Sequence, residues 1–112
     1  MEIRAFARSI HISPQKVRLV IDVIRGKKVK EAQAQLQFMK KAAAIPVLKL
    51  LNSAIANAKN NFKLDDSALY VKTITADEGQ TLHRWMSKAM GRATPVRKRT
   101  THVSIVLDEK IN

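Results

Sequence analysis

The residues best suited to chemistry in this chain lie in one run, HRWMSKAMGRATPVRKRT, at positions 83–100. This run holds six cations, a tryptophan and two methionines, and it has no acidic residue. Guanidinium and ammonium groups bind phosphates, and an aromatic ring stacks on bases. The run therefore predicts contact with a nucleic acid, through Arg84, Trp85, Lys88, Arg92, Arg97, Lys98 and Arg99.

The sequence offers no comparable set of residues for catalysis or for metal binding. His11, His83 and His102 do not have the spacing of metal ligands, and the chain has no cysteine to join them. The acidic residues lie mostly at positions 65–78 and at the C-terminus, where they fit turns and solvated positions. No P-loop, dinucleotide-binding or nucleophile-elbow motif occurs. We expect no catalytic residue, no metal, no cofactor and no small-molecule substrate, and hence no enzyme.

The charge of the chain favours a polyanionic partner. Its 112 residues include 21 Lys and Arg against 9 Asp and Glu, a net charge of +12. A monomer with this charge repels itself, and a nucleic acid is the partner that best relieves that repulsion. The N-terminus lacks the apolar run of a signal peptide, and no stretch of about 20 apolar residues could span a membrane. The absence of cysteine fits a reducing compartment, so we expect a cytoplasmic protein without a membrane partner.

Periodicity predicts three helices and three strands for the body of the protein. Alternating residues indicate strands at residues 2–12, 69–76 and 100–107. Apolar residues at helical spacing indicate helices at residues 14–25, 29–39 and 41–61. This order predicts an α+β fold in a single domain, with three helices packed on one face of a small, three-stranded antiparallel sheet.

Several residues predict the details of these elements. Ser13 and Pro14 suit a helix entrance with a hydroxyl cap, and Gly26 suits the left-handed residue that follows a helix. Pro46 fits only in the first turn of its helix or at a kink. The end of that helix is predicted to fray at Asn57, Asn60 and Asn61. In the first strand, alternation predicts one shared face for Arg4, Phe6, Arg8 and Ile10.

Residues 79–99 form a long insertion between the last two strands, so the globular body comprises residues 1–78 and 100–112. A turn at Gly91 and Arg92 would fold the insertion into a β-hairpin protruding on the order of 30 Å. A ribbon of that length is only marginally stable alone in water, so its order must come from a partner. Two other interpretations stay open: the insertion is a flexible basic loop, or Trp85 is a core residue that caps the sheet.

The body supplies further candidate phosphate contacts. They lie on the first strand, on the first helix and in the glycine turn that follows it, and their alternative is an ordinary solvated basic surface. These candidates are Arg4, Arg8, Lys16, Arg18, Arg25, Lys27 and Lys28.

Four stretches of the chain resemble one known family. They are ISPQKVRLVIDVIRGK, LKLLNSAIANAKNN, LYVKTITADEG and KAMGRATPVRKRTTHVSIVL. In this order, over about residues 3–107, they resemble the bacterial large-subunit ribosomal protein of the L-twenty-two family. The chain departs from the usual pattern of that family at Gln80, where the family has Pro, and at Ser87 and Lys88, where it has Pro and Arg.

The resemblance implies a structural constituent of the large ribosomal subunit that binds 23S rRNA and aids subunit assembly. It implies neighbouring large-subunit ribosomal proteins as partners, and a long β-hairpin that lines the nascent-peptide exit tunnel. By position, the tip that faces the nascent polypeptide would be Met90, Gly91, Arg92 and Ala93. The arm segment linked to macrolide response would be Leu82, His83 and Arg84.

Two other functions are weaker alternatives. Helix, glycine turn and helix across residues 14–39 suggest a free-standing nucleic-acid-binding regulator of the helix-turn-helix type. Against it, the second helix has no Arg or Lys after Glu31 with which to read bases. A basic amphipathic helix could also lie on an anionic membrane, but the apolar face here is only wide enough for a core.

Overall fold

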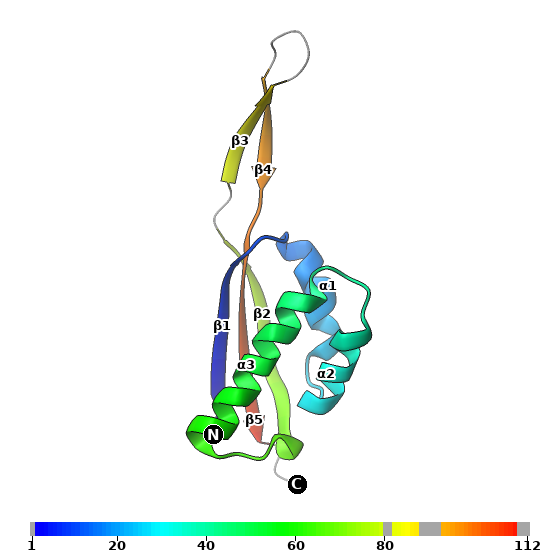
Figure 1. Ribbon diagram of the computed structural model, residues 1–112, viewed down its shortest axis with the longest axis vertical. Helices are drawn as coiled ribbons and strands as arrows, with labels where there is room; N and C mark the ends of the chain where they lie inside the picture. The colour runs from blue at the N-terminus through cyan, green and yellow to red at the C-terminus, as the bar shows by residue number, and fades with distance from the viewer. Residues whose placement is uncertain (1, 80–81, 88–92, 110–112) are drawn as a thin grey trace.

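The computed structural model describes residues 2–79, 82–87 and 93–109 of the chain (Figure 1). Five strands, three α-helices and one short 3-10 helix occur in this part of the chain. In order they are β1 (Ile3–Ile10), α1 (Pro14–Ile24), α2 (Val29–Phe38), α3 (Ala44–Phe62), η1 (Asp66–Ala68), β2 (Leu69–Glu78), β3 (Leu82–Ser87), β4 (Ala93–Lys98) and β5 (Thr101–Glu109).

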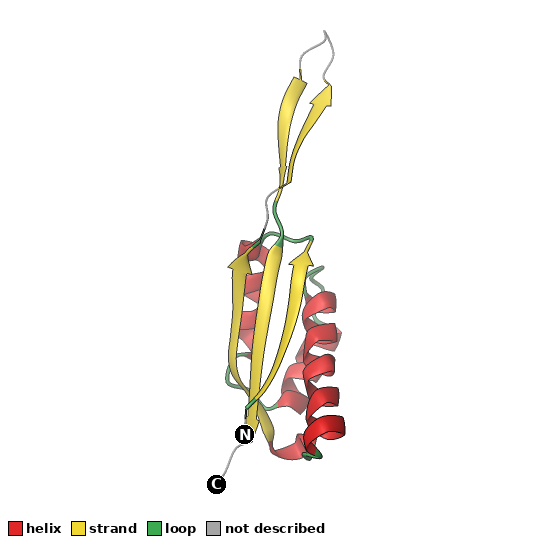
Figure 2. Cartoon of the chain, turned by 90° about the vertical axis from the view of Figure 1, so that its left-hand side faces the viewer, coloured by secondary structure: helices red, strands yellow, loops and turns green. Residues whose placement is uncertain are grey.

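Three of the strands form an antiparallel sheet in the order β1-β5-β2, so the last strand of the chain is the central one. The three helices cover one face of this sheet, and the other face is open (Figure 2). Alternation along β5 buries Thr101, Val103, Ile105 and Leu107 against the helices. The predicted α+β fold, with three helices on one face of a three-stranded sheet, is confirmed.

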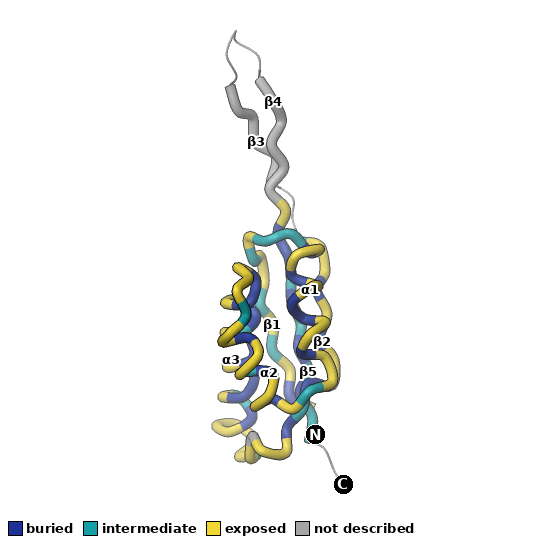
Figure 3. The backbone as a smooth tube through the Cα atoms, turned by 90° about the vertical axis from the view of Figure 1, so that its right-hand side faces the viewer, coloured by how far each residue is buried: buried dark blue, intermediate teal, exposed yellow. Residues whose placement is uncertain are grey.

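The core lies between the helices and the sheet, where the buried residues of both layers meet (Figure 3). Among the described residues, the buried hydrophobic side chains are all Ile, Val, Leu or Ala. The three phenylalanines are exposed instead: Phe6 by 62%, Phe38 by 83% and Phe62 by 41%. The core of the described residues is therefore aliphatic, and none of the three phenylalanine rings is part of it.

Helix α1 begins and ends close to the predicted positions. Pro14 is its first residue, where the missing N–H is not needed, and Gly26 follows the helix with φ of 80°. The predicted hydroxyl cap is wrong, because Ser13 occupies the N-cap position without a side-chain hydrogen bond to the helix. The entrance is therefore fixed by the proline ring, whose φ suits a first helical turn.

Helix α3 differs from its prediction at both ends. It begins at Ala44 and not at residue 41, because the preceding residues form a turn in which the Ala44 N–H donates to the Lys41 oxygen at 3.0 Å. Pro46 lies in the first turn, as one of its two predicted positions required. The predicted fraying is wrong, since the helix runs through Phe62 and closes on Lys63 in the left-handed conformation.

Strand β1 contains an irregularity that the sequence did not indicate. Ser9 has φ of 56°, and the pairing with β5 shifts register between Ala7 and Ile10. Between these two pairs β1 has one residue more than β5, and this bulge turns Ile10 toward the core. The prediction that Ile10 shares a face with Arg4 is therefore wrong. The Ser9 N–H donates to His102 Nδ1 at 3.0 Å, which stabilises the bulge from the central strand.

Strands β3 and β4 form a separate antiparallel pair, from Leu82 opposite Lys98 to Ser87 opposite Ala93. This ribbon lies beyond the end of the three-stranded sheet (Figure 1), and the molecule measures 66 × 25 × 18 Å. Its radius of gyration is 17.1 Å, against roughly 13 Å for a compact chain of this length. The predicted turn at residues 91–92 lies outside the described residues, so the complete hairpin stays a prediction.

Candidate nucleic-acid interface

Strand β1 presents two cations and an aromatic ring on its outward face. Arg4 and Arg8 are exposed, and Phe6 lies between them with 62% of its surface accessible. The three side chains share a face because alternate residues of a strand point the same way. Cations beside an aromatic ring suit a nucleic acid, since the cations contact phosphates and the ring stacks on a base.

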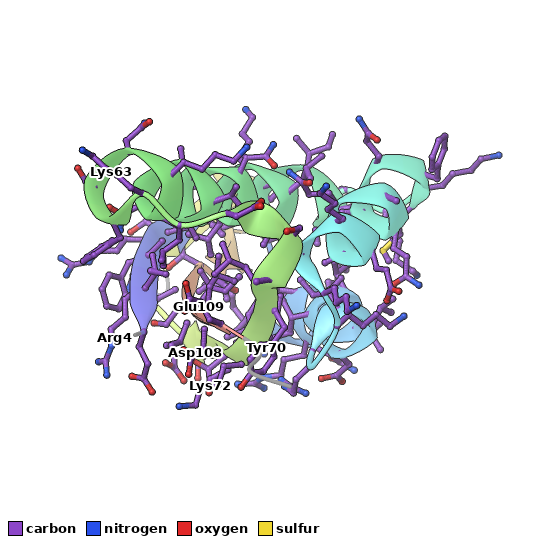
Figure 4. All side chains as sticks on the ribbon, turned by 90° about the horizontal axis from the view of Figure 1, so that it is seen from below. Arg4, Lys63, Tyr70, Lys72, Asp108 and Glu109 are labelled. Atoms are coloured by element: carbon purple, nitrogen blue, oxygen red, sulfur yellow. The ribbon has the colours of Figure 1, made fainter. Side chains whose placement is uncertain are left out.

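Part of the same face holds a chain of ion pairs. Glu2 Oε1 lies 2.5 Å from Lys72 Nζ and its Oε2 lies 3.3 Å from Arg4 Nη2, while Asp108 Oδ2 lies 3.6 Å from Lys72 Nζ. Arg4, Lys72 and Asp108 are labelled in Figure 4. The hydrogen bond from Lys72, then the one from Arg4, lowers the pKa of Glu2. The hydrogen bond to Glu2 raises the pKa of Lys72, and the backbone N–H of Glu109 lowers the pKa of Asp108. The face is therefore charge-balanced here and basic only toward Phe6 and Arg8.

Two of the predicted phosphate contacts have a structural role. Arg18 donates from Nε and Nη2 to the Ala76 oxygen at 3.2 and 3.0 Å. Arg25 donates from Nη2 to the Ile74 oxygen at 3.0 Å and from Nη1 to Asp22 at 2.6 Å. Since β2 is an edge strand, these carbonyls have no strand beside them to supply donors. The two arginines thus attach α1 to the edge of the sheet.

The turn between α1 and α2 continues this attachment along β2. The Gly26 N–H donates to the Val71 oxygen at 3.0 Å, and the Val71 N–H donates to the Lys27 oxygen at 2.9 Å. Lys27 also donates from Nζ to Gln35 Oε1 at 2.8 Å, whereas Lys28 is exposed at the start of α2. Of the two predicted lysines in this turn, Lys28 is the more accessible to a phosphate.

The junction between the body and the β3–β4 ribbon is tightly packed. The Gly79 N–H donates to the Thr100 oxygen at 2.9 Å. A Cβ on Gly79 would lie 2.5 Å from Thr100 Oγ1, so any residue other than glycine would require the Thr100 side chain to move. Arg99 is exposed beside this junction, where it borders a hollow of about 270 Å³ together with Arg18 and Glu78.

The remaining predicted site residues fall into three groups. Lys16 is exposed on α1. Backbone positions within β3 or β4 are described for Leu82, His83, Arg84, Trp85, Ala93, Arg97 and Lys98. The residues that lie outside the described part of the chain are Lys88, Met90, Gly91 and Arg92. The roles assigned to the last two groups stay predictions.

The described histidines and acids were considered as metal ligands and as parts of the fold. His102 accepts the Ser9 N–H at Nδ1, which gives it a structural role at the bulge of β1. No group of three or more His, Cys, Asp or Glu side chains that could hold a metal occurs in residues 2–79, 82–87 and 93–109. Within the same ranges, no helix has both the length and the apolarity that crossing a bilayer requires.

Sequence reasoning missed a groove between β1 and α3. Its volume is about 460 Å³, and polar side chains of α3 face β1 across it. In the sequence, only the alternation of Phe6 with two arginines could have indicated this groove. The asparagines of α3 did not indicate it, because they were interpreted as fraying of the helix end. We call this feature the β1–α3 groove and define it by Arg4, Phe6, Ser53, Asn57, Asn60 and Asn61.

The fold and the exposed side chains define a small, strongly basic α+β protein whose surface suits RNA. The sequence profile of one family, described as ribosomal protein L22p/L17e, matches residues 5–108. The chain therefore belongs to the L22p/L17e family, and the resemblance found in its sequence is confirmed.

Named relatives agree with this match over nearly their whole length. The chain is 55% identical to the large ribosomal subunit protein uL22 of Desulfitobacterium hafniense strain DSM 10664, over 96% of this chain and 94% of that protein. It is 50% identical to the large ribosomal subunit protein uL22 of Clostridium novyi, over 98% of this chain and 99% of that protein.

Proposed function

We propose that this chain is a structural constituent of the large ribosomal subunit, without enzymatic activity. The observation that carries the proposal is the family match over residues 5–108, together with relatives named as large-subunit proteins over at least 94% of their length. The net charge of +12 supports it, because rRNA neutralises the repulsion among these cations. In this role the protein works in the cytoplasm, within the ribosome.

The partners that we propose are 23S rRNA and neighbouring large-subunit ribosomal proteins. On the body, the candidates for phosphate contact that we put first are the exposed Arg4, Arg8, Lys16 and Lys28. Arg18, Arg25 and Lys27 already donate hydrogen bonds within the protein, so we assign them first to the fold and only second to RNA. Binding through such contacts also supports a role in subunit assembly.

The segment of residues 79–99 has the more specific role in this proposal. We propose that it lines the nascent-peptide exit tunnel and that its tip, Met90 to Ala93, contacts the nascent polypeptide. The phosphate contacts of this segment are proposed to be Arg84, Lys88, Arg92, Arg97, Lys98 and Arg99, with Trp85 against bases or sugars. Support comes from the pairing of β3 with β4 beyond the sheet and from the basic composition of the segment.

Sedimentation of cell lysate through a sucrose gradient tests the proposal. We expect the chain to co-sediment with the large subunit and to leave it at high salt, since phosphate contacts weaken as salt rises. The alternative of a free-standing regulator predicts a chain that stays in the light fractions. That result would overturn the ribosomal proposal.

A second experiment tests the tunnel-lining segment alone. Deletion of Leu82, His83 and Arg84 should leave the body folded and still change the inhibitory concentration of macrolides in a strain that depends on this protein. Deletion of three residues from the exposed stretch Lys40, Lys41 and Ala42 serves as the control. An unchanged inhibitory concentration for the first deletion would contradict the role of the arm.

A further inference from the structure

The β1–α3 groove combines the three kinds of group that recognise one nucleotide. Phe6 supplies an aromatic ring, Arg4 supplies a cation, and Ser53, Asn57 and Asn60 supply hydroxyl and amide groups. The volume of about 460 Å³ lies within the usual range of ligand sites, roughly 300–1,000 Å³. An enclosed core pocket would be apolar, whereas this groove is open and lined mainly by polar groups.

The polar wall of the groove comes from one face of α3. Ser53, Ala56, Asn57 and Asn60 follow each other at intervals of three, one and three residues, which places them along one side of a helix. The buried side of α3 carries Leu51, Ala54 and Ala58 among others, so the polar side faces outward. The asparagines therefore lie in a line that runs beside β1.

Asparagine is well suited to reading the edge of a base, because its amide offers both a donor and an acceptor. Asn61 Nδ2 donates to Asn57 Oδ1, and Asn57 Nδ2 lies 3.5 Å from the Arg4 oxygen, at the limit of a hydrogen bond. The first contact runs along α3 and holds the Asn57 amide, while the second reaches β1 and is weak enough to be exchanged for a ligand. Asn60 is exposed in the same wall.

Phe6 and the neighbouring cations complete the site. A phenylalanine that is 62% exposed between two arginines buries little apolar surface in the free protein. A base stacked on the ring would cover it, and base–aromatic stacking is how proteins hold unpaired RNA bases. Arg4 borders the groove and supplies the cation for a phosphate beside such a base, whereas Lys63, at the end of α3, lies at the other corner of this side of the body (Figure 4). The pair between Arg4 and Glu2, at 3.3 Å and exposed, is weak enough to yield to a phosphate.

We propose that the β1–α3 groove binds a single unpaired nucleotide of an RNA, with the base stacked on Phe6 and its edge read by Asn57 and Asn60. This inference rests on the proposed function, because it takes the RNA to be ribosomal. It adds a site on the body that reads a base, in addition to cations that contact phosphates. A neighbouring protein is a weaker candidate for this surface, since the groove offers one aromatic ring among polar and charged groups.

The test measures binding of the full-length chain to protein-free 23S rRNA over a series of salt concentrations. Phe6→Ala should weaken binding about tenfold and leave the salt dependence unchanged, because stacking releases no counterions. Arg4→Ala should instead make the salt dependence less steep, because about one counterion fewer is released on binding. Phe38→Ala is the matched control, since it removes an exposed phenylalanine, 83% accessible, from α2 outside the groove.

A second measurement locates the base. Chemical modification of the rRNA should reveal an unpaired base that is protected by the wild type and by Phe38→Ala, and that becomes reactive again with Phe6→Ala. Phe6→Tyr should restore protection, because the ring is kept. Asn60→Ala, at an exposed helix position, should weaken binding about threefold by loss of one hydrogen bond. Circular dichroism of each variant establishes that it is folded.

The outcomes separate the groove from the proposed function. If the wild type does not bind 23S rRNA, both ideas are overturned. If it binds and Phe6→Ala behaves like Phe38→Ala, only the groove is overturned. Equal rRNA affinity with weaker incorporation of Phe6→Ala into subunits would assign the face to a neighbouring protein. If AMP binds saturably and this binding depends on Phe6, while Phe6→Ala does not change rRNA binding, the groove would be a site for a free nucleotide. Each of these results contradicts the inference.

Discussion

The two edges of the three-stranded sheet are covered in different ways. Along β2, Arg18 and Arg25 donate to the carbonyls of Ala76 and Ile74, and the turn after α1 pairs with Val71. Along β1, the side chains of α3 leave a groove of about 460 Å³. One edge is closed by arginines from a helix, while the other presents its own arginines outward.

This difference shows that arginines in one protein can have two roles, one in holding the fold together and one in binding a partner. An unpaired sheet edge invites pairing with another chain, and proteins cover such edges with helices, loops or charges. Here the β2 edge is covered from within the fold, and the β1 edge carries charge beside an open groove. The arginines of the first edge should matter for stability, and those of the second should matter for binding.

The largest expected effect comes from removing the arginines that close the β2 edge. The double variant Arg18→Ala and Arg25→Ala should lower the free energy of unfolding by about 3 kcal/mol, because hydrogen bonds from charged donors to two carbonyls are lost. The matched variant Arg4→Ala and Arg8→Ala removes the same charge from exposed positions and should change it by less than about 0.5 kcal/mol. Urea unfolding of both variants measures the difference, and equal losses would contradict the comparison.

A second prediction concerns the junction that follows the β2 edge. Gly79→Ala should lower the free energy of unfolding by about 2 kcal/mol, because the added Cβ meets the Thr100 hydroxyl at 2.5 Å. Thr100→Ala removes the obstructing oxygen, so the same glycine substitution should cost less in that background. A double-mutant cycle by urea unfolding gives the coupling, and a value of zero would mean that the contact is not the cause.

The glycine of the turn along β2 should have a smaller effect. Gly26→Ala should lower the free energy of unfolding by about 1 kcal/mol, because φ of 80° is unfavourable for a residue with a Cβ. No atom lies within 4 Å of the added Cβ, so the loss reflects backbone conformation alone. Gly26→Asn should lose less than Gly26→Ala, since asparagine tolerates this conformation better. Thermal unfolding ranks the variants, and the reverse order would refute the explanation.

The smallest effect is expected on the open face near the β1 edge, where Glu2 pairs with Lys72. The folded protein lowers the pKa of Glu2 below its ordinary value of 4.5, so the pair stabilises the fold fully above that pH. The contribution is lost as the pH falls through the lower, folded pKa. Glu2→Gln should therefore flatten the acid end of the stability profile slightly. In a Lys72→Met background the effect of Glu2→Gln should be smaller but not zero, because Arg4 also lowers the pKa of Glu2. A larger loss of stability for Glu2→Gln in acid than at neutral pH would have the wrong sign.

The sequence predicted those parts of the fold whose causes are local. Helix α1 was predicted almost to the residue, because Pro14 and Gly26 act through their own backbone preferences. The bulge at Ser9 could not be predicted, since its N–H is held by His102, a residue 93 positions away. The start of α3 was missed because the turn ahead of Ala44 has no sequence signal of its own.

The candidate site was predicted less well than the fold, for a similar reason. Arg18 and Arg8 look alike in the sequence as cations on regular elements. Both side chains are exposed, and only the packing of α1 against an edge strand shows that Arg18 donates to a backbone carbonyl. The grouping of Phe6 with Asn60 also depends on tertiary structure, because the two residues come from different elements.

The place of β5 in the middle of the sheet has a consequence during synthesis. Ile3 and Val71 both lie opposite Leu107, so neither outer strand has another strand beside it until β5, residues 101–109, is made. At roughly 5–20 residues per second, the N-terminal strand waits for several seconds before it can pair. Any order that the newborn chain has in that interval must come from its helices and from the turn beside β2, and a chain that stops before β5 would have no three-stranded sheet.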